Sequence, residues 1–237
     1  MTCNNKIPDK SIDFKNLKKS FRIIEVYSTN KTGTSTSSMF LYAGSGFILK
    51  SKKDFPQVIV TARHICHHAS LDEEIKHNKD ITYLIIDELG NKSIAKSFSV
   101  NDGYDVCLLS NFKENLDNSG FSIADRPVQY GEKVYSLSAP KSFFKIKNDK
   151  QSGALPVVDG FYSGEFIEKI KTSSVSENII IIDTYTLPST FGASGSPIIN
   201  KEGEVVGMIF AVLTGFNNIT FSVPWFYLKQ IEKYLNK

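Results

Sequence analysis

Cysteine is scarce in this chain of 237 residues, and long apolar runs are missing from it. The three cysteines, Cys3, Cys66 and Cys107, are an odd number, and their spacing indicates no disulfide framework. No apolar run approaches the roughly 20 residues that a transmembrane helix needs, so we expect no membrane partner. Residues 1–20 are polar and charged, which predicts no secretory signal and, by default, a reducing cytoplasmic location.

An excess of charge of one sign is also missing. The sequence has 28 Lys and Arg residues against 25 Asp and Glu residues, a formal net charge of +3. Residues 141–160 interleave basic and aromatic side chains, an arrangement that also occurs in sites for single-stranded nucleic acid. Because the net charge is small, we interpret this segment as a solvated surface loop and expect no nucleic-acid partner.

Short runs of β-branched and aromatic residues dominate the chain, and turn-forming residues separate most of them. This pattern predicts an all-β sandwich or a pair of barrels. The runs cover residues 21–28, 39–50, 57–62, 81–88, 105–110, 132–138, 161–170, 179–186, 204–213 and 219–223. From Pro224 onward the spacing becomes helical, with an apolar stripe formed by Phe226, Leu228, Ile231, Tyr234 and Leu235.

The length of the chain is sufficient for one globular unit or two tightly packed lobes. Asn, Asp, Ser and Gly concentrate between residues 111 and 126, which is typical of a connection between lobes. We therefore divide the chain into a polar N-terminal segment at 1–20, a first β unit at 21–115 and a second at 116–237.

Residues 192–197, Gly-Ala-Ser-Gly-Ser-Pro, are a candidate nucleophile turn. Glycine on either side of the turn removes the Cβ clashes that forbid tight backbone conformations, so that Ser194 projects from it. Such a turn aims the N–H groups of Gly192 and Ser194 at a carbonyl oxygen on which negative charge develops. The alternative is an ordinary turn leading into a strand.

Two upstream segments carry candidate partners for Ser194. Residues 58–66 are a β-branched run that ends in a small-residue turn with His64, a side chain that titrates near neutral pH. Asp105 stands directly before the apolar run 106–109, where an unpaired charge is unfavourable and an imidazole N–H is a suitable partner. A buried structural histidine and a loop-capping aspartate are the alternatives.

In the order His64, Asp105, Ser194, the blocks 61–64, 105–109 and 192–197 resemble the three signature blocks of the trypsin-like serine proteases. Residues 194–212 and 219–224 are similar to the bacterial HtrA and glutamyl-endopeptidase branches. The resemblance covers the chain from about Phe21 onward. It implies two six-stranded antiparallel β-barrels of the chymotrypsin fold and a C-terminal α-helix, with His64 and Asp105 in the first barrel and Ser194 in the second.

The resemblance also implies the chemistry of each residue. Ser194 is the nucleophile, His64 the general base and acid, and Asp105 the group that fixes the imidazole tautomer. The N–H groups of Gly192 and Ser194 form the oxyanion hole. The implied substrate is a polypeptide, and no cofactor is required.

Specificity and activation depart from the digestive members of the family. Ala193 replaces the aspartate that pairs with a new N-terminus in those enzymes, so we expect no activating cleavage. The base of the primary pocket is expected near Pro188 and Ser189, and its walls on two later strands. None of these residues has a carboxylate side chain. We therefore expect an uncharged residue before the scissile bond. The expected pocket residues are Pro188, Ser189, Phe210, Ala211, Val212, Phe221 and Ser222.

Two alternatives belong to other classes of function. One is a catalytically inactive protease fold that serves as a binding module. The other is a metal-binding protein, because several potential ligands crowd one region of the sequence. These ligands are His64, Cys66, His67, His68 and His77.

Overall fold

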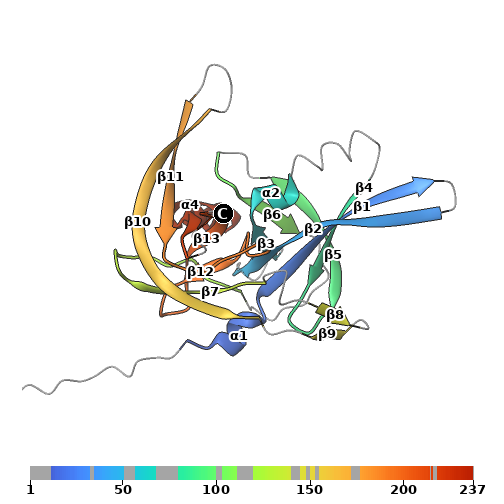
Figure 1. The fold of residues 1–237 in the computed structure, drawn as a ribbon, viewed down its shortest axis with the longest axis horizontal. Helices are drawn as coiled ribbons and strands as arrows, with labels where there is room; N and C mark the ends of the chain where they lie inside the picture. Colours follow the sequence, from blue (N-terminus) through green and yellow to red (C-terminus); the bar gives the residue numbers. More distant parts are fainter. Residues whose placement is uncertain are drawn as a thin grey trace, which may run out of the picture.

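Most of the described chain is β-strand (Figure 1). The computed structural model describes residues 12–32, 35–50, 57–67, 80–99, 103–110, 120–139, 145–147, 150–152, 155–171, 177–213, 215 and 218–236. In chain order, the elements are α1 (Phe14–Lys18), β1 (Phe21–Thr32), β2 (Ser35–Leu49), β3 (Val58–Thr61), α2 (Arg63–Cys66), β4 (Asp80–Ile86), β5 (Lys92–Ser99), β6 (Cys107–Ser110), β7 (Lys133–Leu137), β8 (Lys145–Lys147), β9 (Lys150–Ser152), β10 (Val157–Lys171), β11 (Glu177–Tyr185), β12 (Pro197–Ile199), β13 (Val205–Val212), β14 (Thr220–Pro224) and α4 (Trp225–Leu235).

The first barrel closes in the order β1-β2-β3-β6-β5-β4, with every pair antiparallel. The long β1–β2 pair has a register shift between Val26 and Tyr27, and bulges of this kind bend a strand as closure requires. All four residues of β3 are buried, because both of its neighbours and the barrel interior cover it. This strand leads directly into α2.

The second barrel closes in the order β10-β11-β14-β13-β12-β7. Its interior is a separate apolar cluster that includes Val134, Tyr185, Ile198 and Val206. β10 and β11 form a long curved pair on one side of the molecule (Figure 1). The prediction of two six-stranded antiparallel barrels followed by a helix is confirmed.

Several strands escaped the sequence analysis. In β5 the inward positions hold Ser93, Ala95 and Ser97, so no strong apolar alternation marks this strand, and Ile94 faces solvent. β12 has only three residues and directly follows the turn that carries Ser194. The expected surface loop at 141–160 contains the paired strands β8 and β9 and the start of β10. The expected lobe boundary falls largely on residues 111–119, which lie outside the described residues.

Helix α4 starts directly after Pro224, and its buried residues are Tyr227, Leu228 and Ile231. These residues belong to an apolar cluster that is continuous with the core of the first barrel. Tyr234 of the expected stripe is 71% exposed, whereas Tyr227, which the stripe omitted, is buried. No helix among the described residues combines the length and the apolar character needed to cross a membrane.

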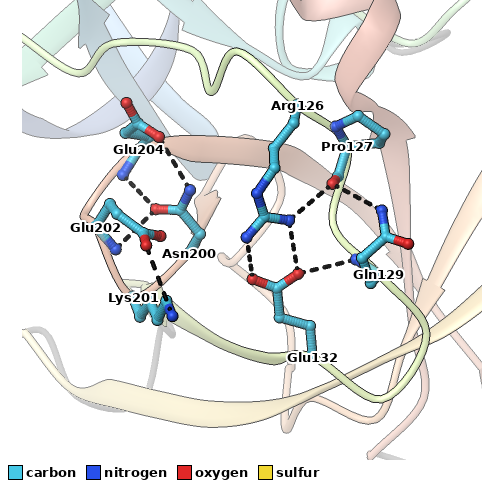
Figure 2. Close-up of polar contacts among 8 residues, drawn as sticks. All are labelled: Arg126, Pro127, Gln129, Glu132, Asn200, Lys201, Glu202 and Glu204. Carbon is cyan, nitrogen blue, oxygen red and sulfur yellow. Dashed lines mark hydrogen bonds and ion pairs between the residues drawn. The ribbon is translucent and has the colours of Figure 1, made fainter. Parts of the chain in front are cut away.

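A polar network fixes the loop before β7 and the turn after β12 (Figure 2). Both terminal nitrogens of Arg126 donate to the Glu132 carboxylate, at 3.0 and 2.8 Å. This pairing lowers the pKa of Glu132. The side-chain oxygen of Asn200 accepts the backbone N–H groups of Glu202 and Glu204, at 3.0 and 2.9 Å. The turn that ends β12 is thereby fixed, and with it the strand that follows Ser194.

Candidate active site

His64 and Asp105 form a doubly bonded pair in the first barrel. His64 lies on α2, a single helical turn that begins one residue after β3 ends. Its Nδ1 atom is 2.6 Å from Oδ2 of Asp105, and its backbone N–H donates to Oδ1 at 2.8 Å. A carboxylate on Nδ1 favours the tautomer that leaves Nε2 free to accept a proton.

Tyr104, the residue before Asp105, makes two contacts that hold this segment in place. The Tyr104 ring packs on Tyr227 of α4 with ring centroids 4.3 Å apart. The Tyr104 hydroxyl also accepts the backbone N–H of Ile181 on β11, at 3.3 Å. The segment that carries Asp105 is therefore held against the C-terminal helix and the second barrel.

The structure contains a disulfide between Cys66 and Cys107, so the expectation of no disulfide is wrong. The Cα atoms are 6.4 Å apart although 41 residues separate the two cysteines in sequence. They meet because β3 pairs with β6, with Thr61 opposite Cys107. One sequence signal was available, since Cys66 and Cys107 stand at the same offset from His64 and Asp105 respectively.

Ser194 stands on a tight turn between β11 and β12. Gly192 and Gly195 have φ angles of 95° and 88°, in the region that glycine adopts without strain. The Ala193 N–H donates to the Thr190 carbonyl at 3.0 Å, and the Gly195 N–H donates to the Ile209 carbonyl at 2.7 Å. These bonds turn the backbone sharply on both sides of the serine.

Ser45 of β2 holds this turn from the first barrel, a contact that the sequence analysis missed. Its backbone N–H donates to the Ser194 carbonyl and its hydroxyl to the Gly192 carbonyl, each at 2.7 Å. Among the described residues, no hydrogen bond engages the N–H of Gly192 or of Ser194. These two donors are therefore available to a carbonyl oxygen of a substrate.

His64 and Ser194 both line one cavity, which has a volume of about 760 Å³. Its volume is in the range of small-molecule and side-chain sites. Although both side chains line it, the structure has no hydrogen bond between these two described residues. The other lining residues are Leu41, Tyr42, Ala43, Ile65, Ser189, Thr190, Phe191, Gly192, Ile209, Phe210, Ala211 and Val212.

The expected pocket residues divide into two groups. Four of them, Ser189, Phe210, Ala211 and Val212, line the cavity, and Pro188, Phe221 and Ser222 are not among its lining residues. Ser222 faces the barrel interior instead, since it is fully buried and donates to the Val223 carbonyl at 3.0 Å.

The cavity is largely apolar and has no charged group to neutralise a cation. No Asp, Glu, Lys or Arg is among the described residues that line it. The hydroxyl of Ser189 is buried there without a hydrogen-bond partner. Phe191, at 87% exposure, is an unusually exposed aromatic residue next to the Ser194 turn.

The potential metal ligands do not assemble in the part of the chain that the structure describes. Within it, no group of three or more His, Cys, Asp or Glu residues is placed to hold a metal ion. Cys66 is in a disulfide and is therefore not a thiolate ligand. His68 and His77 lie outside the described residues.

Comparisons with known proteins agree with the fold. The family model for the trypsin-like peptidase domain matches residues 44–208. The inactive form of the Rv3671c protease is similar at 15% identity and a TM-score of 0.64, over 94% of this chain and 92% of that one. The active form of the same protease, from M. tuberculosis, has 14% identity and a TM-score of 0.64, over 92% and 82%. A serine endoprotease from Yersinia pestis has 17% identity and a TM-score of 0.60, over 93% of this chain and 64% of that one.

Proposed function

Because the chain belongs to the family of trypsin-like peptidase domains, we propose that it is a serine endopeptidase in which Ser194, His64 and Asp105 form the catalytic triad. One observation carries this proposal: His64, bonded to Asp105 at 2.6 Å, lines the same cavity as Ser194. Asp105 and Ser194 belong to different barrels, and the cavity lies where the two barrels meet.

The reaction follows from the roles of these groups. His64 removes the proton of the Ser194 hydroxyl as its oxygen attacks the substrate carbonyl carbon, and the carbonyl oxygen becomes an oxyanion. The N–H groups of Gly192 and Ser194 stabilise that oxyanion. His64 then donates the proton to the leaving amine as the C–N bond breaks, which gives an acyl-enzyme. Water, deprotonated by His64, attacks the acyl carbon. The bond from this carbon to the Ser194 oxygen then breaks, His64 returns the proton to that oxygen, and the carboxylic acid product leaves.

The cavity favours an uncharged side chain before the scissile bond. A buried Arg or Lys side chain in this cavity would lack a carboxylate partner, and an unpaired buried charge costs several kcal/mol. The walls offer apolar contacts from Ile209, Phe210 and Val212. Among the described lining residues, Ser189 has the only buried side-chain nitrogen or oxygen atom without a hydrogen-bond partner.

Activation requires no cleavage in this proposal. Ala193 is buried and has no charge to pair with a new N-terminus. Ser45 performs a related task from the first barrel, since its two hydrogen bonds hold the carbonyls on either side of Ala193. The full-length chain is expected to be active, and an inert full-length chain with an active trimmed form would contradict this.

The disulfide is evidence about the cellular compartment in which the protein resides. The expectation of a cytoplasmic location depended on a chain without disulfides, whereas disulfides persist mainly in oxidising compartments. The Cys66–Cys107 bond therefore favours an oxidising environment over the cytoplasm. Mass spectrometry of alkylated peptides from the native source, with and without prior reduction, distinguishes the two.

A fluorophosphonate probe tests the triad directly, because it reacts only with an activated serine. We expect stoichiometric labelling of the wild type that is lost in Ser194→Ala and in His64→Ala. Ser196→Ala, a matched serine in the same turn, is expected to retain labelling. Each triad variant should lose about 10⁶-fold in kcat, and the double variant hardly more, because the residues act as a unit. A folded wild type that neither reacts with the probe nor cleaves a peptide library would instead favour an inactive binding module.

A further inference from the structure

The disulfide and the catalytic pair connect the same two segments. Cys66 and Cys107 are 41 residues apart, and so are His64 and Asp105. In each segment one residue separates the cysteine from its catalytic neighbour. The covalent bond and the two hydrogen bonds of Asp105 thus form parallel links between α2 and the start of β6, which contact each other (Figure 1).

The Tyr104 contacts hold the Asp105 segment against α4 and β11, but neither contact involves α2. α2 has only four residues, and its N-cap, Ala62, makes no side-chain capping bond. A single helical turn is not stable without tertiary contacts. Asp105 precedes the first residue of β6, so its own backbone lies outside the strand ladder. Cys107 is that first residue, and it is fully buried.

Two further hydrogen bonds hold the C-terminal end of α2, and neither comes from the segment with Asp105. The hydroxyls of Tyr83 and Tyr42 donate to the carbonyls of Cys66 and Ile65, at 2.9 and 3.2 Å. Both tyrosines belong to strands other than β6. Only the disulfide fixes, by a covalent bond, the spacing of the segment with His64 to the segment with Asp105.

We propose that the Cys66–Cys107 disulfide is a positioning element of the active site, which holds α2 against β6 so that Asp105 keeps both hydrogen bonds to His64. This inference rests on the proposed function, because it gives His64 the role of the catalytic base. Cys66 and Cys107 touch no substrate. They act through the pair beside them, and a small displacement of a catalytic group lowers the rate strongly.

The burial of the sulfurs indicates a permanent constraint. Cys66 is 2% exposed and Cys107 is 0% exposed. Thiol exchange requires a thiolate to reach a sulfur, so the folded protein shields this bond from reductants. The rival interpretation is a staple that raises stability and leaves catalysis unaffected, and the experiment must separate these two roles.

The full-length double variant Cys66→Ala/Cys107→Val removes the disulfide and keeps the apolar volume close to that of the two cysteines. The control is Cys3→Ser, which lowers the cysteine count and leaves the disulfide intact. At a temperature well below its unfolding midpoint, we expect the double variant to lose about 10- to 100-fold in kcat with KM within about twofold of the wild type. Cys3→Ser should match the wild type.

A folded double variant with a lower melting temperature but an unchanged kcat would overturn the proposal. If the double variant does not fold, the wild type is unfolded in urea and reduced with a phosphine, which gains an oxygen atom from water as the S–S bond becomes two thiols. It is then refolded either with the thiols kept reduced or after reoxidation. We expect kcat to fall on reduction and to return on reoxidation. Reduced protein that stays folded with full kcat would overturn the proposal equally.

A readout without turnover separates this inference from the proposed function. The Nδ1 proton of His64, bonded to Asp105, should give a low-field proton NMR signal in the wild type. We expect that signal to broaden or disappear in the double variant and to persist in Ser194→Ala. If the wild type has no protease activity but the signal depends on the disulfide, the proposed function fails and the positioning role stands. A signal that is identical with and without the disulfide contradicts the positioning role.

Discussion

Both carboxylate oxygens of Asp105 bond to His64: Oδ2 lies 2.6 Å from the ring Nδ1, and Oδ1 accepts the backbone N–H at 2.8 Å. One side chain therefore fixes both the orientation of the imidazole and the position of the helix that carries it. The backbone bond also supplies α2 with the N-terminal acceptor that Ala62 does not provide. The two functions are separable by substitution.

Asp105→Asn should keep the helix and lose the reaction. The amide of Asn has the shape of the carboxylate, but its NH₂ group facing Nδ1 favours the tautomer with a proton on Nε2, which then does not accept the serine proton. We expect kcat to fall by about 10⁴-fold with KM little changed. Steady-state kinetics with a peptide substrate measure this, and Asp125→Asn, at a surface ion pair, is the control. A loss of less than about tenfold contradicts the assigned role.

Ser45→Ala tests the link between the first barrel and the nucleophile turn. The Ser45 hydroxyl donates to the Gly192 carbonyl at 2.7 Å and accepts the Ala139 N–H at 3.3 Å. Without it the Gly192 carbonyl loses this bond, and the turn that carries the Gly192 and Ser194 N–H groups is held less firmly. We expect kcat to fall about 10- to 100-fold, less than the loss from removing a donor outright. The control is Ser136→Ala, whose buried hydroxyl donates to the Pro197 carbonyl at 2.8 Å. An equal loss of kcat in both variants would indicate a general packing defect.

Gly195→Ala should unfold the turn, because a side chain has no space there. A Cβ at Gly195 would overlap the Ser45 carbonyl oxygen and approach Thr61 Oγ1 to 2.6 Å. Gly131 has a similar φ of 76°, but a Cβ there meets nothing within 4 Å. We expect a loss of about 1 kcal/mol for Gly131→Ala from backbone strain, and of at least about 3 kcal/mol for Gly195→Ala. Chemical denaturation measures both, and equal losses would be inconsistent with the clash.

The sequence predicted those features that depend on residues close together in the chain. A tight turn around Ser194, a histidine at the end of a buried strand and an aspartate before another strand are each visible within about ten residues of chain. The repeated β-type runs predicted an all-β sandwich or a pair of barrels, and the resemblance to a known family implied two barrels of six strands each. Local periodicity indicates which residues of a strand are buried, and both barrels consist of such partly buried strands.

The parts that the sequence did not predict depend on register. Ser45 reaches Gly192 across 147 residues of sequence, and Cys66 reaches Cys107 because β3 pairs with β6. A shift of one residue turns every side chain of a strand to the other face, and alternation alone does not fix that shift between strands far apart in the chain. Ser222 illustrates the same limit, since its strand was predicted but its side chain faces the barrel interior rather than the cavity.

Ser189→Asp should change the preference of the cavity. Ser189 is buried among its lining residues, and its hydroxyl has no partner. A carboxylate there would pair with a basic side chain that the wild type excludes. For the wild type we expect cleavage after Lys or Arg to be at least about 100-fold slower than after uncharged residues, and for Ser189→Asp the order should reverse. A peptide library with a variable residue before the scissile bond measures this. Rapid wild-type cleavage after Arg or Lys would contradict the proposed preference.

Asp183 makes the stability of the second barrel depend on pH. This carboxyl is 5% exposed. Burial, partly opposed by the hydrogen bond from Tyr162, raises the pKa of Asp183 to about 6. The pKa in the unfolded chain is about 4. Between these values the folded state binds the additional proton, so the contribution of Asp183 to stability is largest below about pH 4 and is lost as the pH rises through about 6.

Asp183→Asn removes this dependence, because an amide does not ionise yet still accepts the hydroxyl bond of Tyr162, which is 3.2 Å long. We expect the variant to be more stable than the wild type at pH 7 by on the order of 1–3 kcal/mol and to lose that advantage near pH 4. Urea denaturation at several pH values measures the difference. Asp159→Asn, on an aspartate whose side chain is 56% exposed and paired with Lys133, should change stability little at either pH. A stabilisation by Asp183→Asn that is the same at pH 4 and pH 7 would assign the effect to packing, because only ionisation of the buried carboxyl makes the difference depend on pH.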